Sequence, residues 1–273
     1  MGNAPATTCN QALRDGNSDE IDDADFRLLG PVEAGIGGRR APVDGGRQLA
    51  VLAALALSAG RVVTTERLTR AVWDDTPPPT ARAQIHGSVH RLRRCLPGLI
   101  RTEDQGYLLA VAAEQVDAGM FRCLVGQARA AARDSRPAEA AALYRSALGL
   151  WRGDALSGVA GLREEATELE EERSAAIEGL FAAELGAGRH AQVVADLYGY
   201  VRKLPWRESL RGLLMLALYR CGREAEALTA YWDGHHPLPE LGPQAGRGLG
   251  CLARAIQIRD PRLSAPSARA PLH

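Results

Sequence analysis

The stretch that decides the fold is TARAQIHGSVHRLRRCL, residues Thr80–Leu96. Its apolar residues are spaced four, three and four positions apart, which places them on one stripe of an α-helix: Ile85, Val89, Leu92 and Leu96. At about 100° per residue, the opposite face holds small and basic residues, namely Ala83, Gly87, His90, Arg91 and Arg94. That face is flanked by three more basic residues, Arg82, His86 and Arg93. The sequence therefore predicts a helix that packs on a core through its stripe and presents a basic ridge.

The basic ridge has two interpretations. Arginine can donate two hydrogen bonds to O6 and N7 of a guanine in the DNA major groove, and neighbouring cations can bind phosphates. A run of charge on a helix is also typical of a face that is simply solvated. The helix alone does not distinguish these interpretations, so the flanking sequence decides.

Two helices are predicted before the basic helix. RQLAVLAALALSA, Arg47–Ala59, is apolar and is followed by Gly60, a residue that commonly ends helices. TTERLTRAVW begins with a threonine cap at Thr64 or Thr65, and its core-facing residues are Leu68, Ala71 and Val72, closed by Trp73. The prolines of DDTPPP, Asp74–Pro79, then impose a loop.

Short strands are predicted on both sides of these helices. FRLLGPVEA, Phe26–Ala34, is strand-like with a Gly-Pro interruption and is expected to pair with RRAPVD, Arg39–Asp44, across a glycine-rich turn at Gly35–Gly38. After Pro97 and Gly98, LIRTEDQGYLLAV predicts a hairpin with strands Leu99–Thr102 and Tyr107–Val111. Two helices, a loop, a basic helix and a hairpin follow each other in the order of a winged helix-turn-helix. This order favours DNA binding over a solvated face.

The charge distribution supports the same interpretation. The 273 residues suggest one or two domains, and the formal net charge is zero. Residues 26–111 nevertheless contain twelve arginines and seven acidic residues, a net charge of +5, whereas residues 1–25 have a net charge of −5. The predicted winged helix is therefore a basic module that suits a nucleic-acid partner. The acidic N-terminal stretch has no periodicity and is predicted to be disordered.

The second half of the chain predicts a helical repeat domain. Amphipathic segments lie at Ala138–Trp151, Glu164–Leu185, Ala191–Leu204, Ser209–Cys221 and Glu224–Trp232. Gly188-Arg189 and Gly222-Arg223 are 34 residues apart, and 34 is the tetratricopeptide period. Such repeats either bind partners on a concave surface or serve only as packing. Trp151, Trp206 and Trp232 are predicted to lie in the core of this domain.

Nothing in the sequence indicates catalysis, a cofactor or a metal. The five cysteines are scattered, without metal-ligand spacing, so we expect free buried thiols. His235-His236 has no third ligand in reach by spacing, and the acidic run Glu164–Glu172 is interpreted as a solvated helix face. No catalytic motif or Walker A motif is present. Without a transmembrane segment or signal peptide, we expect a cytoplasmic, nucleoid-associated protein.

At this point the motifs resemble a known family. The order FRLLGPVEA, RQLAVLAALALSAGRVVTTERLTRAVWDD, PPPTARAQIHGSVHRLRRCL and GYLL is similar to the DNA-binding domain of the Streptomyces antibiotic regulatory protein family, which is of the response-regulator output type. The later motifs resemble that family's bacterial transcriptional activation domain: DAGMF, ALYRSALGLWRGDAL, EERSAAIE, LGAGRH, PWRESL, LMLALYRCGREAEALTAY and IRDPRL. The resemblance extends over residues 26–263 in consistent order.

The resemblance implies a transcriptional activator of a secondary-metabolite gene cluster, of the antibiotic type. Two copies, which could form a homodimer on DNA, would bind direct repeats of double-stranded DNA at the promoter and recruit RNA polymerase holoenzyme. Two alternatives stay open: a tetratricopeptide-like adaptor that binds protein, and a ligand-sensing repressor with a winged-helix domain.

The predicted fold is mostly α. A winged helix-turn-helix with a small β-sheet and a wing hairpin is expected at residues 25–112, and an all-α tetratricopeptide-like helical repeat domain at 113–263, between disordered tails at 1–24 and 264–273. No catalytic, cofactor or metal site is predicted. The candidate DNA-binding residues are Arg47, Thr64, Thr65, Arg82, His86, Gly87, His90, Arg91, Arg93, Arg94, Arg101, Thr102 and Tyr107. Among them, Arg91 and Arg94 lie furthest from the apolar stripe and are the favoured base contacts.

Overall fold

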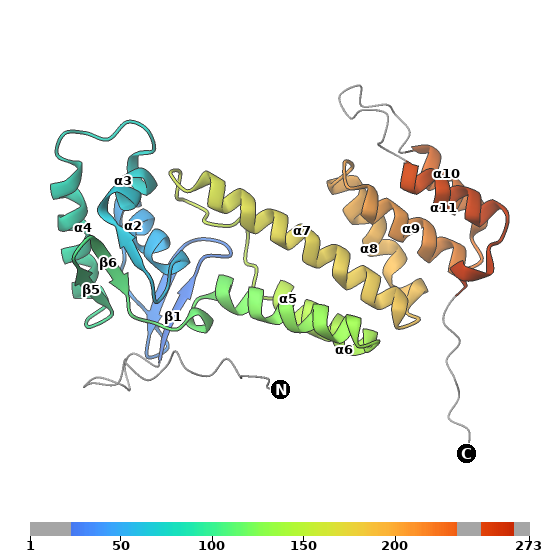
Figure 1. The fold of residues 1–273 in the computed structure, drawn as a ribbon, viewed down its shortest axis with the longest axis horizontal. Coiled ribbons are helices and arrows are strands. Elements are labelled where there is room, and N and C mark those ends of the chain that lie inside the picture. Colours follow the sequence, from blue (N-terminus) through green and yellow to red (C-terminus); the bar gives the residue numbers. More distant parts are fainter. Residues whose placement is uncertain (1–22, 234–246, 265–273) are drawn as a thin grey trace, which may run out of the picture. The chain divides into compact units, whose positions relative to one another are not determined.

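The computed structural model describes residues 23–233 and 247–264 of the protein (Figure 1). Three predictions lie outside the described residues: most of the acidic N-terminal tail, the tail after Ser264, and the His235-His236 pair. The chain divides into two compact units. The first unit contains residues up to Cys123 together with Gly149–Glu172, and the second contains Leu124–Leu148 and the chain from Arg173 onward.

The first unit begins with an antiparallel sheet of three strands in the order β1–β2–β3, which span Ala24–Arg27, Glu33–Ile36 and Arg39–Arg40. The Gly-Pro interruption of Phe26–Ala34 is a full reversal of the chain, so this segment contributes two strands that pair with each other, and only the second of them pairs with Arg39–Arg40. The predicted turn before Arg39 is confirmed at Gly37 and Gly38, whose φ angles of 59° and 71° favour glycine.

Three helices follow and confirm the predicted helical core. They are α2 (Gly46–Leu57), α3 (Thr65–Trp73) and α4 (Ala81–Cys95). The hydroxyl of Thr64 caps α3 by accepting a hydrogen bond from the N–H of Arg67 at 3.2 Å. Helix α2 packs against both α3 and α4 (Figure 1). Each residue of the predicted α4 stripe is at most 1% exposed, so this stripe forms part of the core.

A second antiparallel sheet completes the winged helix. Its order is β4–β6–β5, and the strands span Val62–Thr64, Gly106–Leu109 and Ile100–Glu103. The predicted hairpin is therefore confirmed as β5 and β6, and the extended link before α3 adds the third strand. This arrangement positions the start of α3 beside the hairpin turn, where the N–H of Thr65 donates to the carbonyl of Gln105 at 3.3 Å.

The connection between β1 and β2 is bonded to residues far along the chain. The N–H groups of Leu28 and Leu29 donate to the two carboxylate oxygens of Asp117 at 2.7 and 3.1 Å. Their carbonyl groups accept from the N–H groups of Leu156 and Arg152 at 2.8 and 2.7 Å. Residues that the sequence assigns to the second domain therefore pack within the first unit.

Asp117 is the first residue of α5 (Asp117–Arg133), and its side chain is 10% exposed. Burial raises the pKa of the Asp117 carboxyl, while the N–H groups of Leu28 and Leu29 and the nearby Arg152 guanidinium act to lower this pKa. Removal of the carboxyl group would therefore leave two backbone N–H groups without their acceptor.

The remaining elements are helical. The five amphipathic segments are confirmed as helices α6 to α10, and the described residues also include helices α5 and α11 and two short 3-10 helices, η1 and η2. The bounds are Pro137–Leu148, Arg163–Gly186, His190–Lys203, Glu208–Arg220 and Glu224–Asp233 for α6 to α10, Arg247–Gln257 for α11, and Ala113–Gln115 and Pro261–Leu263 for η1 and η2. Within the second unit, α8 packs on α9, α9 on α10, and α11 on both α9 and α10 (Figure 1).

The 34-residue repeat has a structural counterpart. Gly188 and Gly222 have φ angles of 81° and 75°, and each follows the end of a helix. The N–H of Arg189 donates to the carbonyl of Glu184, and the N–H of Arg223 donates to that of Leu218. Both turns therefore end a helix through the same left-handed glycine cap. The repeated glycines mark the points where successive helices reverse direction.

Two expectations about buried side chains are wrong. Trp206 and Trp232 are 57% and 62% exposed, because one precedes α9 in a turn and the other lies near the end of α10. Trp151 is half-buried and makes an edge-to-face contact with Phe121, with ring centroids 5.5 Å apart. Among the described cysteines, Cys123 and Cys251 are exposed rather than buried, and Cys95 and Cys221 are half-buried.

The acidic run at the start of α7 is also more than a solvated face. Glu172 accepts hydrogen bonds from both the Nε and Nη2 atoms of Arg122 in α5, at 2.9 and 3.0 Å. The main-chain N–H of Ala155 donates to Glu170 at 2.9 Å. The hydrogen bonds of Glu170 and Glu172 therefore hold the start of α7 in the first unit.

Replacement of Asp117 by alanine tests the bonded β1–β2 connection. Asp117→Ala leaves two buried N–H groups unpaired, so we expect the free energy of unfolding of the first unit to fall by about 3 kcal/mol. Urea titration and amide hydrogen exchange at Leu28 and Leu29 measure this loss. Asp154→Ala removes an exposed carboxylate of the same unit and serves as the control. Equal stability of the two variants would contradict the proposed role of Asp117.

Candidate nucleic-acid interface

The basic ridge of α4 lies on the surface of the first unit. Arg82, His86, His90, Arg91 and Arg94 are exposed, while Gly87 and Arg93 are half-buried. Arg91 and Arg94 form no hydrogen bond or ion pair with another described residue, so both guanidinium groups are available to an external partner. A side chain at Gly87 would meet no atom within 4 Å, which leaves the middle of the ridge open to a close approach.

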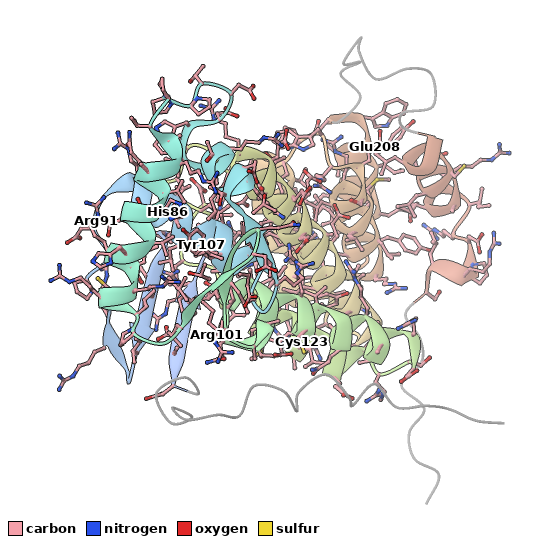
Figure 2. The ribbon with its side chains drawn as sticks, turned by 60° about the vertical axis from the view of Figure 1, so that its left-hand side comes forward. His86, Arg91, Arg101, Tyr107, Cys123 and Glu208 are labelled. Atoms are coloured by element: carbon pink, nitrogen blue, oxygen red, sulfur yellow. The ribbon has the colours of Figure 1, made fainter. Side chains whose placement is uncertain are left out.

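One flank of the ridge contacts the hairpin. The hydroxyl of Tyr107 in β6 lies 2.6 Å from Nδ1 of His86, and the two rings meet edge to face. Figure 2 shows His86 on the side of α4 that faces Tyr107, and Arg91 on the other side of the helix. Tyr107 is 3% exposed, so the side chain of this candidate DNA-binding residue lies inside the domain rather than on the surface.

Arg93 binds the hairpin as well. Its Nε donates to the carbonyl of Ile100 at 3.0 Å, and its Nη2 donates to the hydroxyl of Thr102 at 2.6 Å. The guanidinium carbon also lies 5.8 Å from the centre of the Tyr107 ring, within the range of a cation–π contact. Arg93 and Thr102 are therefore bonded to each other within the domain.

The rest of the hairpin offers one cation. Arg101 is exposed in the middle of β5, where the alternation of a strand points it away from the face shared by Thr102 and Tyr107 (Figure 2). Glu103 at the end of β5 and Asp104 in the turn are exposed and carry the opposite charge to the α4 ridge. Because these carboxylates repel phosphates, Arg101 is the hairpin residue best suited to a phosphate contact.

Three candidate residues lie near α3. Thr64 caps this helix, and Thr65 is its half-buried first residue. Because the N–H of Thr65 already donates to the carbonyl of Gln105, a phosphate contact at this site would use the threonine hydroxyl groups. Arg47 in α2 is exposed, and its guanidinium carbon lies 5.7 Å from the centre of the Trp73 ring. Arg47 is therefore positioned by an aromatic side chain, and this contact does not neutralise its charge as an ion pair would.

Sequence reasoning missed two residues that position this surface. The carbonyl of Gln105 holds the start of α3 against the hairpin, and Asp117 holds the β1–β2 connection. A main-chain contact such as that of Gln105 leaves no trace in the residue type. Asp117 does have a signal, because an acidic residue at the start of a helix is a common cap, but its partners are distant in sequence.

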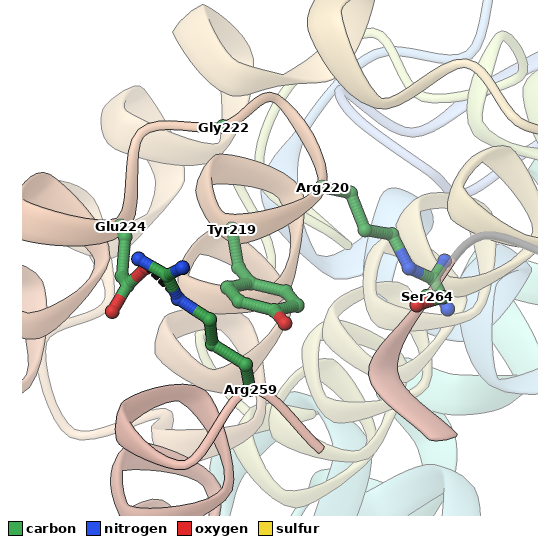
Figure 3. A pocket seen from close by; sticks show the side chains of 6 residues that line it. All are labelled: Tyr219, Arg220, Gly222, Glu224, Arg259 and Ser264. Atoms are coloured by element: carbon green, nitrogen blue, oxygen red, sulfur yellow. Dashed lines mark hydrogen bonds and ion pairs between the residues drawn. The ribbon is translucent and has the colours of Figure 1, made fainter. Parts of the chain in front are cut away.

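A hollow of about 370 Å³ lies in the second unit beside Tyr219 and Ser264 (Figure 3). Arg259 donates to Glu224 at 3.2 Å there, and Arg220 donates to the carbonyls of Leu185 and Leu263. Burial lowers the pKa of the Arg220 guanidinium. Both guanidinium groups at this hollow are thus bonded within the chain.

Two features are absent from the described part of the chain. No group of three or more histidine, cysteine, aspartate or glutamate side chains there is arranged to hold a metal ion. No helix there has the length and apolar character needed to cross a bilayer.

Comparisons with known proteins agree with this architecture. A family model described as the bacterial transcriptional activator domain matches residues 116–257, and a model for the C-terminal domain of transcriptional regulatory proteins matches residues 45–109. The structure of EmbR from Mycobacterium tuberculosis, in complex with a low-affinity phosphopeptide, superposes with a TM-score of 0.82 at 32% identity. That match covers 87% of this chain and 65% of EmbR.

Curated relatives include three regulators from Streptomyces. The transcriptional regulator RedD of Streptomyces coelicolor is 34% identical, over 89% of this chain and 73% of RedD. The regulatory protein DnrI of Streptomyces peucetius is 32% identical, over 86% of this chain and 93% of DnrI. The regulatory protein AfsR of Streptomyces coelicolor is 38% identical, but this chain spans only 25% of its length.

These matches cover both the winged helix and the helical region, in the same order as in the relatives. The family is one of transcription regulators rather than enzymes. The chain therefore belongs to the Streptomyces antibiotic regulatory protein family, as a DNA-binding transcriptional regulator in which a winged helix precedes a bacterial transcriptional activator domain.

Proposed function

We propose that the protein is a sequence-specific activator of a secondary-metabolite gene cluster, of the antibiotic type, and that it binds direct repeats at promoters. The observation behind this proposal is the α4 ridge, where Arg91 and Arg94 are exposed while the stripe on the opposite side is buried. A helix held in this way can enter the major groove. The two arginines would contact bases, and the other cations would contact phosphates.

The contacts of the other candidates follow from their positions. Arg82, His86, His90 and Gly87 lie along the ridge, and Arg101, Arg47, Thr64 and Thr65 would bind phosphates on its sides. Because Arg93, Thr102 and Tyr107 are bonded within the domain, we propose that they hold the hairpin against α4. The DNA-binding domain would span residues 25–112, and the activation domain 113–263.

Activation requires a second partner. We propose that the helical domain and the winged helix together recruit RNA polymerase holoenzyme once two copies occupy adjacent repeats, in the cytoplasm. Helical repeats of this kind stack into surfaces suited to protein binding. A homodimer on DNA would follow from two adjacent sites. A tetratricopeptide-like adaptor without DNA binding is disfavoured, because such an adaptor has no need for unpaired arginines on α4.

The choice of Arg91 as a base contact can be tested by mutation. Arg91→Ala is expected to weaken specific binding by about 1–3 kcal/mol and to relax the preference at one base pair. Binding to a library of variant sites measures both effects. Arg129→Ala, which removes an exposed arginine of the second unit, is the matched control and should bind normally. A uniform loss on specific and random DNA would make Arg91 a phosphate contact instead.

The overall function can be tested on promoters from the neighbourhood of the gene. We expect footprints on spaced direct repeats, with affinity falling steeply as salt rises because bound phosphates release counterions. Transcription with purified RNA polymerase holoenzyme should rise when the protein is added. Equal and weak binding to all duplexes would overturn the proposal of a sequence-specific regulator. Reduced transcription from bound promoters would identify the protein as a repressor.

A further inference from the structure

The contact between His86 and Tyr107 determines more than the position of the hairpin. Tyr107 is buried, and its hydroxyl has one hydrogen-bond partner among the described residues, Nδ1 of His86 at 2.6 Å. A buried hydroxyl proton needs an acceptor, and an unprotonated imidazole nitrogen is one. The arrangement that satisfies this hydroxyl therefore has Nδ1 of neutral His86 accepting and the ring proton on Nε2.

The surroundings of Tyr107 favour this direction of the hydrogen bond. Burial raises the pKa of the Tyr107 hydroxyl, while the charges of Arg93 and Arg82 act to lower this pKa. The hydroxyl thus keeps its proton at neutral pH and can donate it. Arg93 lies against the Tyr107 ring and is itself bonded to Ile100 and Thr102, which prevents the ring from swinging away from α4.

The second nitrogen of His86 faces a different environment. His86 is exposed, and its Nε2 makes no hydrogen bond with another described residue. Arg82, His86, His90 and Arg94 follow each other at intervals of four along α4, so their side chains lie in one row. The Nε2–H group therefore belongs to the same ridge as the arginines.

We propose that Tyr107 is a positioning residue that fixes His86 in its Nε2–H tautomer, so that His86 presents a hydrogen-bond donor to an acceptor atom of DNA. The acceptor is a phosphate oxygen or a base-edge atom such as guanine N7 or O6. Arg93 assists by holding the Tyr107 ring. This inference rests on the proposed function of α4 as the helix that enters the DNA groove.

The tautomer can be measured without DNA. The nitrogen chemical shifts of the His86 ring in the full-length protein distinguish protonation at Nδ1 from protonation at Nε2. We expect the Nε2–H form in the wild type and a mixture of tautomers in Tyr107→Phe, which removes only the hydroxyl. Protonation at Nδ1 in the wild type, or an unchanged ring in Tyr107→Phe, would overturn the proposal.

The consequence for binding is tested by a double-mutant cycle on the footprinted promoter. His86→Ala should weaken specific binding by roughly threefold to tenfold, the range of one hydrogen bond, and Tyr107→Phe by a smaller factor that is set by the fraction of His86 left in the Nε2–H tautomer. In the His86→Ala background, Tyr107→Phe should have no further effect, because the donor that it positions is gone. Tyr219→Phe, a half-buried tyrosine of the second unit, is the control.

The remaining outcomes are distinguishable. A loss on promoter and random duplex alike would identify a phosphate as the acceptor, whereas a loss on the promoter alone would identify a base. Independent losses in the cycle, or normal binding by His86→Ala, would show that His86 is not the donor. If the wild type itself binds no DNA specifically, the proposed function fails along with the DNA contact of His86, and the nitrogen shifts still decide the tautomer.

Discussion

The structure depends on how the main chain between β1 and β2 satisfies its hydrogen bonds. A buried peptide group needs a partner, and the sharp reversal at Gly30-Pro31 leaves Leu28 and Leu29 without strand neighbours. Their partners come from Asp117, Arg152 and Leu156, up to 128 positions away. The start of the helical region is therefore built into the same unit as the winged helix. Separation of the two would expose several unpaired polar groups at once.

The α4 helix is constrained from two sides. Its stripe is fully buried, which fixes the rotation of the helix and leaves the ridge outward. The hairpin then binds one flank through His86 and Arg93. In this protein the hairpin has acidic residues in its turn and one exposed arginine. The hairpin therefore holds α4 in place, and Arg101 is its exposed cation.

The second unit follows a simpler physical rule. Each helix buries one face against its neighbours, and Gly188 and Gly222, which have positive φ, follow α7 and α9 and allow the chain to reverse there. Glu184 lies buried at one of these ends and binds both Arg145 and Arg189, so its charge is compensated. Exposed tryptophans at Trp206 and Trp232 show that size and apolar character do not by themselves place a residue in this core.

The sequence by itself determined the local elements and the chemical character of the interface. Helix periodicity, the Thr64 cap and the prolines after α3 are local signals, and they located α2, α3 and α4 to within a few residues. The same periodicity separated the buried stripe from the exposed Arg91 and Arg94. These features depend on neighbours within one or two helical turns, which a sequence pattern records directly.

Only the tertiary structure decided which candidates are bonded inside the domain. Tyr107, Thr102 and Arg93 are residue types that can contact a phosphate. The hydrogen bonds of Tyr107 with His86 and of Arg93 with Thr102 form only because β6, β5 and α4 meet in space. The split of the first predicted strand had the same cause, since Asp117 and Leu156 bind the reversal from afar. Partners that are distant in sequence leave no periodic signal, so a linear pattern could not reveal them.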